Sequence, residues 1–109
     1  MNREILLKEL DAILSLIKEK ITDDSDMVWT RFDAPQQLLQ EIDNVFLALQ
    51  NSITYNSIYQ LEMLFGPTAS LQEHSITNGW GNEFIILAEK IDTISANLKL
   101  HFFSSQMAR

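Results

Sequence analysis

The chain has 109 residues and a mass of 12.5 kDa, which suits one compact domain and leaves no room for two separate cores. Hydrophobic residues make up 46% of the chain and charged residues 21%, which excludes the disordered class. The net charge of −7 argues against nucleic-acid binding through phosphate contacts, because such binding needs an excess of Lys and Arg.

The first predicted element is a helix over residues 5–21. Apolar residues recur there at intervals of three and four, which places them on one helical face and contradicts the alternation of a strand. Asn2 is expected to cap this helix at its N-terminus, and the polar run 22–26 is expected to end it.

A loop with two aromatic residues, Trp29 and Phe32, follows the first helix. Both rings are expected to be buried, because a protein of this size rarely leaves a Trp exposed. A second helix is predicted to start within Asp33-Ala34-Pro35-Gln36, and its apolar residues recur at helical spacing over 38–49. Its start is open between a proline at the first helical position, Pro35, and a side-chain cap at Asp33.

A third helix is predicted from a capping pair, Ser57 with Gln60, and is ended by the sequence Gly66-Pro67. The stretch 66–82 contains all three glycines of the chain and no continuous apolar pattern, so it is predicted to be an irregular loop with a short turn after Ser70.

The last predicted helix begins near Phe84 and forms an apolar seam of about 20 residues, or roughly 30 Å. Short connections between amphipathic helices favour antiparallel packing. The sequence therefore predicts an all-α fold, namely a four-helix, bundle-like single domain over residues 1–109 with an irregular loop at about 66–82.

The charge is distributed unevenly along the chain. Residues 32–89 contain seven acidic residues and no Lys or Arg, whereas the remaining residues contain eight acids and all eight bases. The whole net charge therefore belongs to the middle of the chain. This pattern favours a surface that meets a basic partner, although simple solubility explains it equally well.

Trp80 lies between two glycines, just before the last predicted helix. It has two interpretations, which are an anchor for a partner or a core side chain that folds the loop back over the helices. The core interpretation is favoured.

No cofactor or metal site is predicted. Cysteine is absent, the two histidines lack the spacing of a metal motif, and no glycine-rich phosphate loop is present. No secretory signal or membrane-spanning run is found, so a cytoplasmic protein without membrane attachment is expected. His74 beside Glu73 is a candidate for a general base, but we expect the protein not to be an enzyme.

The stretches 64–73 and 78–84 resemble small uncharacterised bacterial proteins with a P-T-x-x-L-Q-E … G-W-G-x-E-F pattern, a resemblance that implies no chemistry. As a short, acidic, cysteine-free chain, the protein also resembles, by class alone, the immunity proteins of bacterial toxin systems.

The resulting hypothesis is an immunity protein or antitoxin, a monomer or small homo-oligomer, that neutralises a basic toxin domain such as a nuclease. The residues expected to bind this partner are Asp33, Glu41, Asp43, Tyr59, Glu62, Glu73, Trp80 and Glu83. Two alternatives remain open: a helical subunit of a larger assembly, and a small ligand-binding domain or enzyme centred on residues 66–83.

Overall fold

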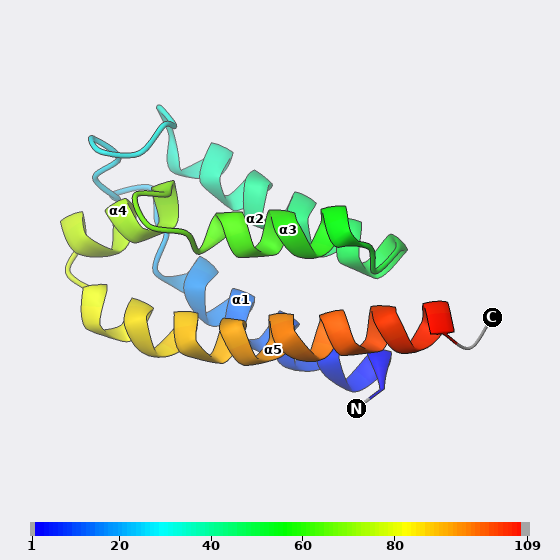
Figure 1. Ribbon diagram of the computed structural model, residues 1–109. Helices are drawn as coiled ribbons and strands as arrows, with labels where there is room; N and C mark the ends of the chain where they lie inside the picture. The colour runs from blue at the N-terminus through cyan, green and yellow to red at the C-terminus, as the bar shows by residue number, and fades with distance from the viewer. Residues whose placement is uncertain (1, 108–109) are drawn as a thin grey trace.

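The computed structural model describes residues 2–107, and within this range the chain is all-helical, as the sequence predicts (Figure 1). The helices of the described range are α1 (Arg3–Glu19), α2 (Pro35–Asn51), α3 (Tyr55–Leu64), α4 (Ser70–Thr77) and α5 (Gly81–Met107). The stretch expected to be irregular thus contains a short helix, α4, in the place where a single turn was predicted. No helix in residues 2–107 combines the length and the apolar character needed to cross a membrane.

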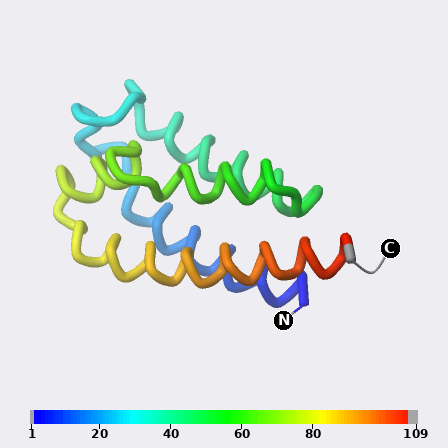
Figure 2. The backbone as a smooth tube through the Cα atoms, viewed as in Figure 1, coloured from blue at the N-terminus to red at the C-terminus, as the bar shows by residue number. Residues whose placement is uncertain are grey.

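The helices are arranged along one long axis, and the molecule measures 48 × 23 × 21 Å. Helix α1 runs antiparallel to α5, and α2 runs antiparallel to α3 (Figure 1, and the same view as a tube in Figure 2). Helix α1 contacts both α2 and α5, α3 contacts the same two helices, and α4 contacts α5. The loop between α1 and α2 and the short helix α4 therefore share one end of the molecule, and both ends of the described chain lie at the other.

The core consists of the apolar faces that the helical spacing predicts. The longest contributions come from α1 and α5, whose buried apolar residues are Leu6, Leu7, Leu10, Ile13, Leu14, Ile17, Phe84, Leu87, Ile91, Ile94 and Leu98. Full burial of one such side chain stabilises the folded state by about 1.5–3 kcal/mol, so these faces fix the positions of the helices.

The helix starts show which capping predictions were correct. Asn2 caps α1, because its Oδ1 accepts a hydrogen bond from the Ile5 amide at 2.9 Å. Helix α2 starts with Pro35 at its first position, the first of the two predicted alternatives. The predicted start of α3 was wrong: Thr54 caps this helix and Ser57 reciprocates, so Ser57 lies in the first turn instead of before it.

Within the described residues, four ion pairs connect different segments of the chain, and each joins an acid of residues 32–89 to a base from outside that range. Lys18 of α1 pairs with Asp43 of α2 at 2.8 Å, and Lys20 pairs with Glu83 of α5 at 2.7 Å. Lys99 of α5 pairs with Glu62 of α3 at 2.8 Å, and Arg31 pairs with Glu41 of α2. The charge separation along the sequence is thus partly removed by folding, because the basic ends pack against the acidic middle.

Candidate functional site

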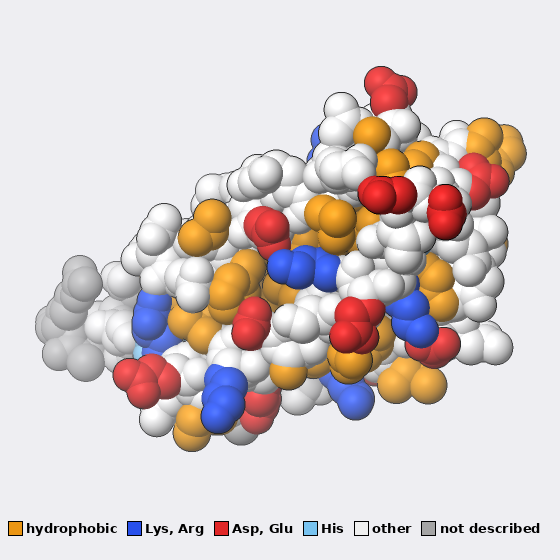
Figure 3. Space-filling view, turned by 180° about the vertical axis from the view of Figure 1, so that it is seen from behind, with side chains coloured by type: hydrophobic (Ala, Val, Ile, Leu, Met, Phe, Trp, Pro, Cys, Tyr) orange, Lys and Arg blue, Asp and Glu red, His pale blue; other side chains and the backbone are white. Residues whose placement is uncertain are grey.

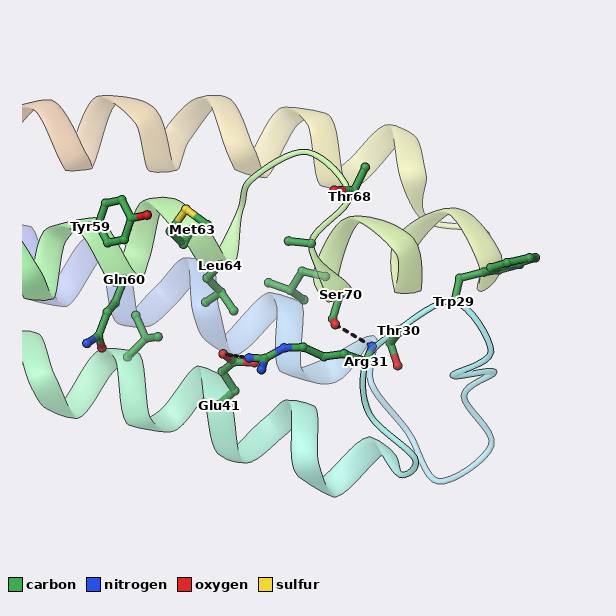
Figure 4. A pocket seen from close by; sticks show the side chains of 13 residues that line it. Trp29, Thr30, Arg31, Glu41, Tyr59, Gln60, Met63, Leu64, Thr68 and Ser70 are labelled. Atoms are coloured by element: carbon green, nitrogen blue, oxygen red, sulfur yellow. Dashed lines mark hydrogen bonds and ion pairs between the residues drawn. The ribbon is translucent and has the colours of Figure 1, made fainter.

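A cleft of about 570 Å³ lies at the end of the molecule formed by the α1–α2 loop, within the range of about 300–1,000 Å³ that is usual for ligand sites (Figure 4). Its lining comes from this loop, α2, α3 and the start of α4. The lining residues are Trp29, Thr30, Arg31, Glu41, Val45, Tyr59, Gln60, Met63, Leu64, Thr68, Ala69, Ser70 and Leu71.

The loop that forms one wall of the cleft is fixed by hydrogen bonds to distant residues. Asn78, which follows α4, accepts from the amide of Asp26 at 2.8 Å and donates to the carbonyl of the same residue at 2.8 Å. Its amide nitrogen also donates to the carbonyl of His74 at 2.9 Å. The hydroxyl of Ser70 accepts from the Arg31 amide at 3.1 Å, so the loop is held at two points along α4.

Among residues 2–107, Arg31 and Glu41 are the only charged residues that line the cleft. The Arg31 side chain reaches from the loop towards α2 and pairs with the Glu41 carboxylate (Figure 4). Its guanidinium carbon also lies 4.6 Å from the centre of the Phe32 ring, within the range of a cation–π contact. The cation of the cleft is thus held by one carboxylate and one aromatic face.

Thr68, which also lines the cleft, is the one non-glycine residue with a positive φ in the described part of the chain, at 64°. A β-branched residue is strained in this left-handed conformation by about 1–3 kcal/mol. Such strain is concentrated at binding and active sites, so it singles out this wall of the cleft.

The outward face of α3 carries three large side chains at a spacing of four, Tyr55, Tyr59 and Met63, and each is more than half exposed. Tyr59 lies at the centre of this stripe and lines two hollows, the cleft on one side and a second hollow of about 540 Å³ beside Phe103 on the other. We call the three residues the α3 stripe. It makes a continuous apolar and aromatic path between the two hollows.

Trp29 was expected to be buried, and this prediction was wrong. Its indole is 71% exposed and extends from the loop away from the protein (Figure 4). The loop is held by backbone and side-chain hydrogen bonds and does not need the indole in the core. Phe32, three residues later, is partly buried and packs against the core.

Trp80 lies in the core, 4% exposed, which agrees with the favoured interpretation and removes it from the surface available to a partner. Its indole N–H donates to His74 Nδ1 at 3.0 Å. The imidazole is fully buried, and this burial lowers the pKa of His74. His74 Nε2 has no hydrogen-bond partner in the described residues, and the buried ring cannot serve a substrate as a general base.

The other predicted partner-binding residues are dispersed. Glu41 and Tyr59 line the cleft, and Glu62 lies beside Tyr59 in the second hollow. Asp43 and Glu83 lie elsewhere, in ion pairs with bases of α1 and of the residue after it. The remaining two are Glu73, partly buried on α4, and Asp33, exposed in the α1–α2 loop.

Glu62, which lies beside Tyr59, also connects α3 to α5 through hydrogen bonds. It accepts a hydrogen bond from Lys99 at 2.8 Å and one from the Ser95 hydroxyl at 3.0 Å. The bond from Lys99 lowers the pKa of Glu62, with help from Ser95, and outweighs the desolvation that acts in the opposite direction.

Part of the acidic charge that makes no ion pair within residues 2–107 lies in the α1–α2 loop. Four exposed aspartates lie there, and none has an ion pair within residues 2–107: Asp23, Asp24, Asp26 and Asp33. Figure 3 shows acidic side chains grouped at this end of the molecule, at the upper right. The loop thus adds an acidic border to the end of the molecule that contains the cleft.

Sequence reasoning missed several residues of this end, among them Arg31, Met63, Thr68 and Asn78. One signal was available for Met63, because Tyr55, Tyr59 and Met63 follow the same helical spacing on the face opposite to Ile58 and Leu61. No local signal marks Asn78, whose partner Asp26 is 52 residues away.

No family model, no curated protein and no solved structure matches the chain. The resemblances stated from the sequence therefore remain predictions.

Proposed function

We propose that the protein is a non-enzymatic binding protein that neutralises a basic protein domain, in the manner of the immunity proteins of bacterial toxins. The contact surface is the α3 stripe, with the cleft and Trp29 at one end of it. We also propose a cytoplasmic location and a monomer or small homo-oligomer.

The observation that carries this proposal is the exposure of the α3 stripe and Trp29. Tyr and Trp are enriched among the residues that contribute most to protein–protein binding, because they bury a large area with little loss of conformational freedom. Trp29, Tyr59 and Met63, each more than half exposed, line the cleft, and Tyr55 continues the α3 stripe towards the other end of the molecule, beside Phe102 and Phe103.

A basic partner is supported by the charge of the same end. The four aspartates of the α1–α2 loop are exposed, and the chain has a net charge of −7. Complementary charge accelerates encounter and selects among partners. An inhibitor role, as opposed to catalysis, is supported by the burial of His74, whose Nδ1 is already bonded to Trp80.

A four-helix bundle of α1, α2, α3 and α5 is the architecture we propose for this binding protein, with α4 as an addition at one end. It is supported by the closed series of contacts in which each of the four helices touches two of the others. Such a frame presents α3 as a rigid element to a partner.

The test compares captured proteins from the native host between the wild type and the double variant Tyr59→Ala/Met63→Ala. The double variant Ile85→Ala/Ile86→Ala removes similarly exposed apolar side chains from α5 and serves as the control. We expect a basic protein that forms a one-to-one complex with the wild type and the control, binds the α3 variant at least about tenfold more weakly, and loses its own activity in the complex. A protein that binds all three equally, or that keeps its activity when bound, contradicts the proposal.

A second candidate function is binding of a small ligand near residues 66–83, since Thr68, Ser70 and Leu71 line the cleft. The two functions differ in their footprint. A small ligand perturbs the amide resonances of Thr68 and Ser70 and leaves Tyr55 unchanged, whereas a protein partner on the α3 stripe perturbs all three.

A further inference from the structure

The Arg31 side chain lies in the cleft and is held there by few contacts, so another group could replace it. Its backbone is fixed by Ser70, but its side chain is 66% exposed and is held only at its tip, by Glu41 and the Phe32 ring. Exposed ion pairs contribute little to stability, so the fold does not depend on this contact.

Glu41 is less exposed than its partner, with 30% of its side chain accessible, and it projects from the rigid helix α2. In the described part of the chain it is the only anion that lines the cleft. Apolar side chains of Val45, Leu64 and Met63 line the same space. A carboxylate beside apolar walls and an aromatic face is the environment that a guanidinium group needs, since it can form two parallel hydrogen bonds and stack at once.

We propose that Glu41 is the receptor for an arginine side chain of the partner, and that Arg31 is an internal substitute that leaves when this arginine enters. The inference deepens the proposed function and depends on it for the identity of the partner. The exchange replaces one guanidinium by another on the same carboxylate, so it gives up no ion pair. The incoming side chain gains contacts with Met63 and Tyr59 along the α3 stripe, which Arg31 approaches only from the loop side (Figure 4).

The site is also expected to distinguish arginine from other side chains of similar size. Lysine carries a compact charge that cannot form the two parallel bonds or stack on a ring. Citrulline has nearly the shape of arginine but no charge. The site is therefore expected to select arginine over both.

The test uses N-acetyl-arginine-methylamide as a probe, with the lysine and citrulline analogues as controls, in NMR titrations of the full chain. The proteins are the wild type, Arg31→Gln, Glu41→Gln and the double variant Arg31→Gln/Glu41→Gln. We expect Arg31→Gln to bind the arginine probe at least fivefold more tightly than the wild type, with shifts at Glu41 and Val45. We expect no saturable binding to either protein with Glu41→Gln, and no saturable binding of the citrulline probe to any of them.

Equal binding of the probe by Arg31→Gln and the wild type overturns the inference, as does retained binding by Glu41→Gln or equal binding of the lysine probe. Matching thermal unfolding of the four proteins shows that the fold is intact in each. The probe requires no protein partner, so this result is separate from the capture experiment. If the basic partner binds the α3 stripe but the probe fails, only the arginine receptor is wrong.

Discussion

The indole of Trp80 donates its hydrogen bond to Nδ1 of His74 within the core, at 3.0 Å. This contact defines the protonation state of the imidazole. Nδ1 must be free of a proton to accept the bond, so the neutral ring carries its proton on Nε2. A second proton would place two donors face to face in a site without water access.

We predict that stability falls as the pH is lowered below about 6.5, the ordinary pKa of histidine. Burial lowers the pKa of His74 in the folded state, so between the folded and unfolded pKa values the unfolded chain binds more protons. The contribution of this group is complete above the unfolded pKa and is lost as the pH falls through the folded one. Urea denaturation between pH 7.5 and pH 5.5 measures the effect.

The variant His74→Gln keeps an acceptor for the indole and removes the titrating ring. Its stability is expected to fall less than that of the wild type over the same pH interval. An equally large fall in His74→Gln contradicts the assignment.

We predict that Thr68→Asn stabilises the protein by about 0.5–1 kcal/mol. Asn tolerates the left-handed conformation that strains a β-branched residue at φ 64°. The control Thr93→Asn lies within α5, where the backbone is helical and no relief is available. Thermal and urea unfolding give the comparison, and an equal or negative change at Thr68 contradicts the presence of strain.

We predict that Asn78→Ala destabilises the protein by about 1–3 kcal/mol, because both backbone groups of Asp26 lose their partner, whereas the carbonyl of His74 keeps the backbone N–H of residue 78. The amide resonance of Asp26 is expected to shift towards its random-coil position. The matched control Asn82→Ala removes an exposed side chain from α5 and is expected to change stability by less than about 0.5 kcal/mol. Equal effects of the two substitutions contradict the role of Asn78 in holding the loop.

We predict that the double reversal Asp24→Lys/Asp33→Lys slows association with the basic partner by roughly an order of magnitude at low salt. These two carboxylates make no side-chain hydrogen bond within residues 2–107, so their reversal changes the field without disturbing the loop. The control Asp11→Lys/Asp92→Lys changes the net charge equally on exposed positions of α1 and α5. Stopped-flow kinetics at several ionic strengths distinguish a local effect from one of total charge.

The sequence predicts the helices well where one apolar face repeats over several turns. The spacing in α1 and α5 identifies their buried residues. Five or more apolar positions at intervals of three and four fit a helix and do not fit the alternation of a strand. Helix α4 has only eight residues, too few for such a pattern, and was expected to be only a short turn. The start of α3 was displaced because Thr54 and Ser57 are both capping residues, and the sequence offers no local reason to prefer one.

The candidate site depends on contacts between residues that are far apart in the sequence, and no local sequence pattern shows these contacts. Trp29 and Trp80 both lie in or beside a loop, but Trp29 is exposed, whereas Trp80 is buried and bonded to His74, a contact that no local sequence pattern indicates. The acidic residues of 32–89 were expected to favour one acidic surface. Ion pairs with bases from other segments neutralise four of the seven. Tyr59 was found because an exposed Tyr in a helix suits an interface, whichever helices surround it.

Helix α4 is too short to be stable as an isolated helix, and its order depends on what is bonded to it. Its bonds to the α1–α2 loop through Ser70 and Asn78 mean that the two segments lose their order together. We therefore expect this end of the molecule to open as one cooperative unit. In the free protein it is where a protease would first cut, and a bound partner that spans the loop and α3 would close that route and lengthen the lifetime of the chain.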